Sequence, residues 1–321
     1  MSQNYLRKIG LFVSNAQGQG IDLSNMEIIF HTTQADTSTP NTASIRVLNL
    51  TQNTEKTIRN EFQKVRLQAG YEGGNYGVIF SGQIARFRTG RLDAKDKFLE
   101  IMAGDGDKAF QFALVNKTLA AGASQQDRMN AVAESFAKYD VTYDAKGNPV
   151  PGTGGVLPRG KVLFGLARDQ MGPVADTSDA TWSIQNGQVV LIPMTGYLSG
   201  EAVVLNSRTG LIGVPEATEN GVEASILINP NIKIGTRVQI DQKLINQTQL
   251  NQQGFPRYTD INFVASVAQD GFYRVLVSEH EGDIRGGPWN TNITCLAINQ
   301  SSPQDKSVLP YGIAPNAGGA A

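Results

Sequence analysis

The sequence has few of the residues that bind metals or form disulfides: one cysteine and two histidines among 321 residues. Cys295 has no partner for an internal disulfide, which fits a reducing compartment, and its alternating apolar surroundings predict packing within a strand. His31 and His280 have no second ligand at helical spacing, and Glu279-His280-Glu281 is interpreted as a charged rim at a strand end. We therefore expect no metal site and no cofactor.

A surplus of positive charge and long apolar runs are also missing. The chain carries 28 basic and 29 acidic residues, a balance that argues against a nucleic-acid-binding surface but leaves a local basic patch open. No stretch approaches the roughly 18 apolar residues of a membrane span, and the apolar run at the N-terminus is too short for a signal peptide. The sequence thus predicts a soluble protein, made in the cytoplasm and not inserted in a membrane.

Catalytic signatures are missing as well. The chain has no Gly-x-Ser-x-Gly motif, and Cys295 has no base in view. A pair of carboxylates that converges only in the fold is not excluded, but nothing in the sequence points to one. We expect no enzyme activity and no catalytic or cofactor-binding residues.

Two short motifs come close to ligand-binding patterns. Gly155, Gly160 and Lys161 have the spacing of a phosphate-binding loop, but Val162 replaces the hydroxyl residue that would hold magnesium, and no buried strand precedes the loop. Lys161 is therefore interpreted as a solvated residue in a first helical turn, and no ATP binding is expected. Gly104-Asp105-Gly106-Asp107 lacks the spacing of a calcium loop, so a turn with self-capping aspartates is favoured.

Residues 1–106 predict a β-rich module, because short runs with apolar residues at every second position alternate with turn formers. A helix is expected over residues 51–62, with Ile58 and Phe62 on one face. Strands are expected at 65–71, 78–88 and 97–103, with a hairpin turn at 72–75 whose two glycines take positive φ.

Residues 107–200 predict a small α+β region. Ser124 begins the clearest helix, over residues 124–138, because Ser124 and Asp127 match a capping box and apolar residues then recur at helical spacing. A second helix is expected over 161–171, ended by Gly172-Pro173. A hairpin over residues 181–192 is expected to turn at Asn186-Gly187.

A second β-rich module is expected over residues 201–298, with strands at 223–228, 236–240, 262–269 and 272–280. The last two strands flank Asp270-Gly271, a strong hairpin signal. Residues 242–254 are rich in Gln and Asn and are predicted to form a mobile loop, and residues 299–321 an extended or disordered tail. The predicted fold class is mainly β with a small α+β insert.

A cluster of basic residues lies around one predicted hairpin end. Arg86 and Arg88 are two positions apart and share a strand face, and Arg91, Lys95 and Lys97 follow. A solvated tip or a contact with an acidic protein surface is favoured over contact with DNA phosphates.

Four stretches carry a family resemblance: LPRGKVLFGLARDQ (157–170), WSIQNGQVVLIP (182–193), AVVLNSRTGLIGVPE (202–216) and YRVLVSEHEGDIRGGPWNTNITC (273–295). They resemble baseplate hub proteins of contractile-tailed bacteriophages, and the chain is also similar to the N-terminal part of type VI secretion spike proteins. The resemblance implies two tail-tube-like β-barrel or sandwich domains flanking a small α+β region.

The resemblance also implies a structural function in the virion. Three copies would form a ring that acts as a symmetry adapter between a hexameric tail tube and a trimeric spike, with a lumen for DNA passage. The implied partners are further copies of the chain, the tail tube protein and the central spike protein, with wedge and tape-measure proteins as further candidates. The protein would then lie in the tail baseplate after synthesis in the host cytoplasm.

A receptor- or carbohydrate-binding β protein of the tail is the alternative. Such a protein would show clustered exposed aromatics for sugar stacking, whereas Trp182 and Trp289 lie far apart in the sequence. A hub that carries a lysozyme domain is a third option, but no segment is spare to form one.

Limited proteolysis tests the predicted mobile segments. Residues 242–254 and 299–321 have few apolar groups to hold them in place, so a dilute protease should cut there first. Mass spectrometry of the earliest fragments identifies the sites. First cuts within residues 78–103 would contradict the assignment of the rigid modules.

Overall fold

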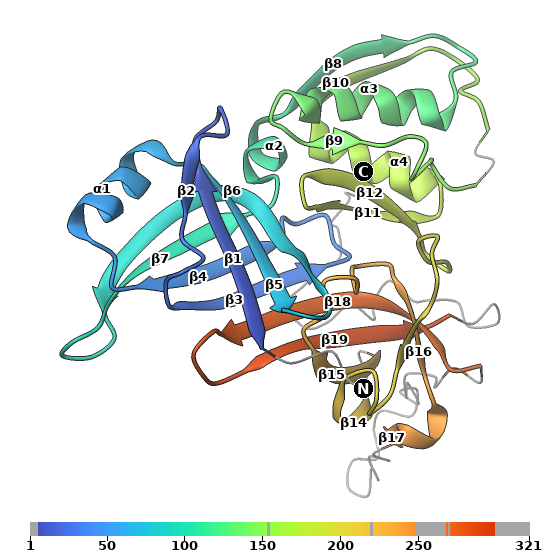
Figure 1. Ribbon diagram of the computed structural model, residues 1–321. Coiled ribbons are helices and arrows are strands. Elements are labelled where there is room, and N and C mark those ends of the chain that lie inside the picture. Colours follow the sequence, from blue (N-terminus) through green and yellow to red (C-terminus); the bar gives the residue numbers. More distant parts are fainter. Residues whose placement is uncertain (1–5, 153–154, 219–220, 248–267, 269, 299–321) are drawn as a thin grey trace, which may run out of the picture.

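The structure is a computed structural model that describes residues 6–152, 155–218, 221–247, 268 and 270–298. It is mainly β, with α+β structure in the middle of the chain, and this confirms the predicted fold class (Figure 1). Among the described residues, no helix is long and apolar enough to cross a membrane.

The first β region, residues 1–106, contains one helix and a curled sheet. Its strands follow the order β3-β4-β7-β6-β5-β1-β2 within the main sheet. Its elements are β1 (Arg7–Ser14), β2 (Gly20–Asp22), β3 (Ile28–Ala35), β4 (Thr42–Leu48), α1 (Gln52–Glu61), β5 (Lys64–Tyr71), β6 (Tyr76–Arg91) and β7 (Lys97–Gly104).

Strand β6 forms the corner of this sheet. Up to Gln83 it pairs with β5, and from Gln83 onward it pairs with β7, with a bulge between Ile84 and Arg86. The sheet therefore folds over, and one buried core fills the space between its two halves. That core includes Leu11, Ile45, Leu67 and Ile101.

The predicted helix and hairpin of this region are present. Helix α1 begins after Thr51, whose side chain accepts a hydrogen bond from the Thr54 amide, and Ile58 is its buried residue. The turn after β5 lies where predicted, but the reason was wrong, because the glycines at 73 and 74 do not take positive φ. Gly70 does, with φ 153°, and a Cβ there would lie 1.9 Å from the Asn75 oxygen.

The middle region, residues 107–200, packs helices against two small sheets around its own core. The capping box of α3 is confirmed, since Ser124 and Asp127 bond to each other's backbone amides. The predicted hairpin is also confirmed, with Asn186 and Gly187 at positive φ. The elements are α2 (Asp107–Phe112), β8 (Leu114–Leu119), α3 (Gln125–Ala137), β9 (Thr142–Tyr143), β10 (Lys161–Leu166), α4 (Ala167–Thr177), β11 (Ala180–Gln185) and β12 (Gln188–Pro193).

The helix predicted over residues 161–171 is wrong at both ends. Lys161–Leu166 is strand β10, paired with β8, and α4 runs from Ala167 through Pro173 to Thr177. Val162 and Phe164 are exposed while Leu163 is buried. This alternation spans too few residues, all of them apolar, to be recognised in the sequence. Pro173 removes one intrahelical hydrogen bond, and buried residues on both sides of it hold the helix against the core.

The second β region, residues 201–298, confirms the strands predicted at 223–228 and 236–240. Of residues 242–254, the first part forms a 3-10 turn and a short strand, and 248–254 lie outside the described residues, as does most of the predicted strand 262–269. The elements are β13 (Val203–Leu205), β14 (Leu211–Thr218), β15 (Gly221–Leu227), β16 (Arg237–Ile240), the 3-10 turn η1 (Gln242–Leu244), β17 (Asn246–Gln247), β18 (Phe272–Asp283) and β19 (Trp289–Ala297).

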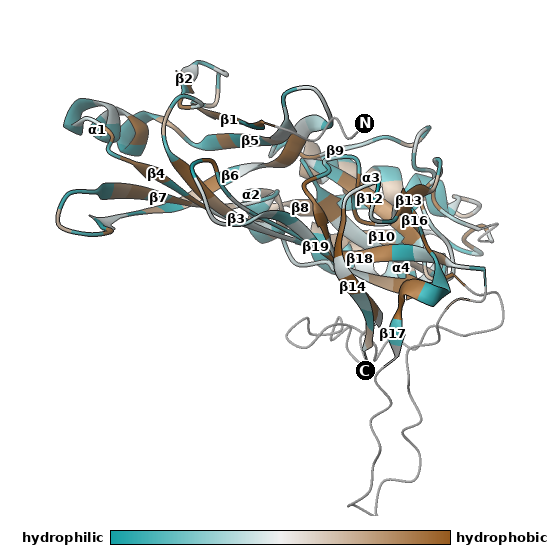
Figure 2. Cartoon of the chain, turned by 60° about the horizontal axis from the view of Figure 1, so that its bottom comes forward, coloured by the Kyte–Doolittle hydropathy of each residue, from teal (hydrophilic) through white to brown (hydrophobic). Residues whose placement is uncertain are grey.

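The two β regions share one sheet. Strand β18 pairs with β3 in a ladder that runs from Val277–Ala35 to Asp283–Ile29, and this ladder completes a 14-stranded sheet. Residues 1–106 and 201–298 are therefore two stretches of sequence whose strands belong to one sheet. Figure 2 shows apolar residues concentrated along these strands, whereas most of α1 has hydrophilic residues.

Replacement of Ile58 tests how α1 is held. Ile58 is the buried residue of α1 and is 0% exposed, so Ile58→Ala should cost about 2–4 kcal/mol of unfolding free energy. Urea denaturation of both proteins measures the difference. Lys56→Ala, at an exposed site on the same helix, is the control and should change stability by less than about 0.5 kcal/mol.

Candidate interaction surfaces

A buried ion pair lies where the three parts of the chain meet. Asp36, directly after β3, is 3% exposed and Arg274 of β18 is 2% exposed. Arg274 Nη2 lies 3.7 Å from Asp36 Oδ2, and Thr181 of β11 donates to Asp36 Oδ1 at 2.7 Å. Arg274 Nη1 also donates to the Pro193 carbonyl at 2.6 Å. Burial raises the pKa of Asp36, although Arg274 and Thr181 oppose the shift.

A second buried polar cluster joins β4 and β7 to the β11–β12 hairpin. Asn41 donates to the Ile184 carbonyl at 3.0 Å and to Gln185 Oε1 at 2.8 Å. Asp105 accepts hydrogen bonds from the backbone amides of Asn186 and Gly187 at the hairpin turn. These directional bonds fix the hairpin, and with it the middle region, against the strand ends of the first β region.

The turn predicted at residues 104–107 is present at Asp105 and Gly106, but its aspartates do not cap it themselves. Asp105 is 1% exposed and bonds to the distant hairpin, and Asp107 accepts from Gln111 one helical turn later. The long-range partners could not be seen in the sequence because they lie about 80 residues away. Among the described residues, no group of three or more His, Cys, Asp or Glu side chains could hold a metal ion.

The two histidines have different surroundings. His280 is 1% exposed in β18 and its Nδ1 lies 2.8 Å from Thr291 Oγ1; burial lowers its pKa to about 4. The charged-rim interpretation is therefore wrong for His280, because β3 adds to β18 and places this stretch in the middle of the sheet. His31 is exposed on β3. Cys295 is buried in β19 as predicted, and burial raises the pKa of its thiol.

The predicted basic cluster is partly neutralised. Arg88 Nε lies 2.6 Å from Glu100 Oε2 and Arg46 Nε lies 3.0 Å from Glu100 Oε1. Burial of Glu100 opposes ionisation, but the Ser44 hydroxyl and both guanidinium groups outweigh it and lower the pKa of Glu100. Arg86 lies on the same face and its Nε contacts Met102 Sδ. Arg91, Lys95 and Lys97 are exposed at the hairpin end.

These charged residues belong to a polar band across the main sheet, opposite the apolar core. The register places its members side by side from one strand to the next, and neither Arg nor Glu dominates along it. We call this band the outer polar face. Its members, in order from β6 to β19, are Arg88, Glu100, Arg46, Ser44, His31, Thr33, Glu281, Glu279, Asn290 and Asn292.

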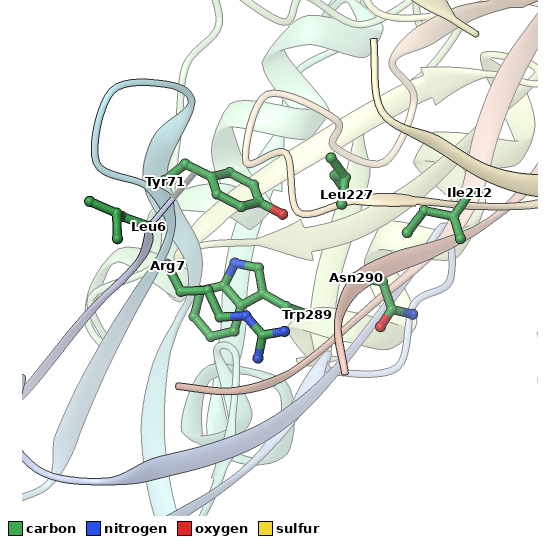
Figure 3. A pocket seen from close by; sticks show the side chains of 7 residues that line it. All are labelled: Leu6, Arg7, Tyr71, Ile212, Leu227, Trp289 and Asn290. Carbon is green, nitrogen blue, oxygen red and sulfur yellow. The ribbon is translucent and has the colours of Figure 1, made fainter. Parts of the chain in front are cut away.

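A pocket of about 400 Å³ lies between the two β regions, where β1 and β19 begin and β5 ends (Figure 3). Arg7 lies over the Trp289 ring at 5.5 Å and donates to the Asp283 carbonyl at 2.6 Å. The residues that line the pocket are Leu6, Arg7, Tyr71, Ile212, Leu227, Trp289 and Asn290. The arrangement ties the β18–β19 turn to β1, because Arg7 also bonds to the Gly286 and Gly287 carbonyls.

The two tryptophans offer no surface for sugar stacking. Trp182 is 3% exposed and Trp289 is 5% exposed. Trp289 packs edge-on against Phe30, with ring centroids 5.6 Å apart. Both residues belong to apolar cores.

The near-match to a phosphate-binding loop lies before and within β10. Lys161 is in a strand, so its assignment to a first helical turn is wrong. Val162 is 64% exposed and faces away from the helices. The segment thus lacks the strand–loop–helix order in which such loops hold phosphate.

Comparison with known proteins gives matches in structure alone. No protein-family model matches the sequence, and no curated protein matches it. The fold is similar to that of a 43 kDa tail protein of prophage MuSo2 from Shewanella oneidensis, with a TM-score of 0.54, 8% identity, and coverage of 91% of this chain and 98% of that one. A tail protein from Neisseria meningitidis has a TM-score of 0.54 and 10% identity, covering 91% and 96%.

A third similar structure comes from a secretion system. It is an E. coli protein described as a type VI secretion component with structural similarity to the T4 tail proteins gp27 and gp5; the TM-score is 0.50 at 8% identity, covering 89% of this chain and 77% of that one. The fold is therefore that of bacteriophage tail proteins. The sequence resemblance to baseplate hub proteins is confirmed at the level of fold.

Asp105→Asn should change how stability depends on pH. Burial raises the pKa of Asp105 to about 7, against the hydrogen bonds from Gly187, Asn186 and Asn41. The folded protein thus holds a proton that the unfolded chain releases near pH 4, so Asp105 lowers stability as the pH rises toward 7, by up to about 1.4 kcal/mol per pH unit. The amide that replaces the carboxyl group cannot ionise, and the variant should lose this slope.

Urea denaturation of both proteins at several values from pH 4.5 to 7 measures the effect. The difference between wild type and variant isolates Asp105, since Asp36 and His280 titrate alike in both. Parallel curves for the two proteins would show that Asp105 stays ionised throughout this range.

Proposed function

We propose that the chain is a structural hub of a phage tail baseplate, built as a ring of three copies. The observation that supports this most is a fold shared with phage tail proteins over about nine tenths of the chain. We further propose that residues 1–106 and 201–298 act as two tube-like β domains, with 107–200 as a small domain between them and 299–321 as a tail.

The ring explains why one chain would carry two β domains. Three copies present six such units, so one side of the ring can stack on a six-fold tail tube and the other on a three-fold spike. Contacts between neighbouring copies would use the ends of the main sheet, where strand edges are open, and helix α1, which projects from the first β region (Figure 1). Tail tube and spike proteins are thus the partners that the arrangement fits, with wedge and tape-measure proteins as further candidates.

The outer polar face is suited to line a lumen through which DNA passes. Glu100 pairs with both Arg46 and Arg88 and offsets one of their two positive charges, and Glu279 and Glu281 add two negative charges on β18. A lumen with surplus Lys and Arg would hold DNA phosphates and slow their passage. A balanced polar lining instead permits passage without binding.

The residues support a structural protein, not an enzyme. Cys295, His280 and Asp105, buried groups whose pKa values burial shifts strongly, lie in separate places, each bonded within the fold or packed in its core. The alternative, a sugar-binding tail protein, finds no support in Trp182 and Trp289, which are buried. The hub protein would lie in the virion tail after synthesis in the host cytoplasm.

Mass and symmetry test the proposal. The purified chain, alone and with its cognate spike, should sediment as a three-copy assembly and show a ring with a central hole in negative-stain images. The ring should have six-fold pseudo-symmetry. A persistent monomer or dimer in the presence of the spike, or a three-copy ring without that pseudo-symmetry, would reject the hub function.

A further inference from the structure

The outer surface of the β8–β10 ribbon is apolar and exposed. The ribbon has two strands, and its inner residues Val115 and Leu163 are buried against the helices of the middle region. We call its outer side the apolar ribbon. Its exposed apolar side chains, with their exposed fractions, are Leu114 (64%), Val162 (64%) and Phe164 (72%), and the exposed polar residues Asn116 and Thr118 lie beside them. Phe112, the last residue of α2, is 58% exposed just before β8. Such a patch on the surface of a folded protein marks a contact surface.

Positive charges at one end of the ribbon lack neutralising partners. Arg128 of α3 is 3% exposed, and its Nε has no hydrogen-bond partner. Neither Arg128 nor Lys161 forms an ion pair within the part of the chain that the structure describes, and the charge of Arg128 helps to lower the pKa of Lys161. Arg159 is exposed two positions before Lys161. Arg128 is buried and Lys161 lies on the inner side of β10, so the exposed Arg159 is the charge that this end of the ribbon offers to a partner with carboxylates.

Strand β14, next to the end of the main sheet, has the complementary character, and the short strand β17 pairs only with its residues Glu216 and Ala217. On β14, Ile212 is 43% exposed and Val214 is 63% exposed. Glu216 lies directly opposite Glu223 of β15, and both are exposed. Two like charges in this register repel each other, and neither forms an ion pair with another described residue. We call these four side chains the acidic edge.

The apolar ribbon and the acidic edge lie at opposite ends of the molecule in Figure 1. They therefore cannot meet within one chain. Two different, complementary surfaces on one chain are what a closed ring requires, because each copy then offers one surface to each neighbour.

We propose that the apolar ribbon of one copy docks on the acidic edge of a second copy. Phe164 and Val162 would cover Ile212 and Val214, while the exposed Arg159 would face Glu216 and Glu223 of the neighbouring copy. The contact covers apolar surface and gives the repelling Glu216–Glu223 pair a counter-charge. This inference rests on the proposed ring and adds a contact of the middle region to those at the ends of the main sheet and at α1.

The first test removes one apolar side chain. Phe164→Ser should raise the dissociation constant of the assembly at least about tenfold, because burial of a large apolar side chain contributes a factor of this size or more. Sedimentation of the purified full chain over a range of concentrations, with the spike added where assembly requires it, measures the change. Leu92→Ser, at an exposed apolar residue of the β6–β7 turn, is the matched control and should leave assembly unchanged.

The second test exchanges charges across the contact. Arg159→Glu and Glu216→Arg should each weaken assembly about tenfold, and the double variant should regain much of the wild-type affinity. Lys146→Glu, an exposed charge elsewhere in the middle region, is the control. Circular dichroism spectra identical to wild type show that each variant is folded.

The outcomes separate this inference from the function on which it rests. A wild-type ring that Phe164→Ser and Arg159→Glu leave intact would overturn the contact and keep the hub function. A wild-type chain that stays monomeric even with the spike would overturn both. Binding of the ribbon to a panel of soluble glycans, lost in Phe164→Ser while assembly persists, would overturn the contact in favour of a sugar-binding surface.

Discussion

The backbone ladder between β3 and β18 is the constraint on which the rest of the structure depends. It joins strands about 240 residues apart and turns two stretches of β structure into one sheet. The same ladder places His280 in the middle of the sheet. It also aligns the residues of the outer polar face from strand to strand, from β6 to β19. Asp36 follows β3 directly and Arg274 lies in β18, so the same ladder brings the buried ion pair together.

The middle region is oriented by directional polar contacts. Most of its apolar core is separate from the cores of the two β regions, although Ile192 of β12 packs in the core of the second β region. Thr181, Gln185 and the amides of the β11–β12 turn bond to Asp36, Asn41 and Asp105 at the strand ends. Buried polar bonds of this kind add little net stability when complete, but they are costly to break and allow few alternative geometries.

Among the described residues, no group of three or more His, Cys, Asp and Glu side chains could hold a metal ion. The distinctive features of the described residues are surfaces. The groups with strongly shifted pKa values are buried within the fold, where they make internal contacts. The features that remain unused by the single chain are the apolar ribbon, the acidic edge and the outer polar face. The fold itself is similar to that of solved tail proteins.

The sequence by itself determined much of the local structure. Helices α1 and α3, the Asn186-Gly187 hairpin and the burial of Cys295 follow from caps, turn residues and apolar spacing, which act within a few residues. The strand at Lys161–Leu166 was missed because its alternation spans only a few residues before a true helix begins. The two glycines at 73 and 74 predicted a turn that is present, but they do not have the positive φ on which the prediction depended.

Only the tertiary structure decided how distant segments meet. The β3–β18 ladder, the contact of Asp105 with a hairpin about 80 residues away, and the partners of Arg46 and Arg88 on Glu100 have no local sequence signal. Strand order depends on which edges find each other in space, and many pairings satisfy the same alternating pattern. For that reason the sequence alone indicated a mainly β chain, whereas the single sheet and its contact surfaces required the fold.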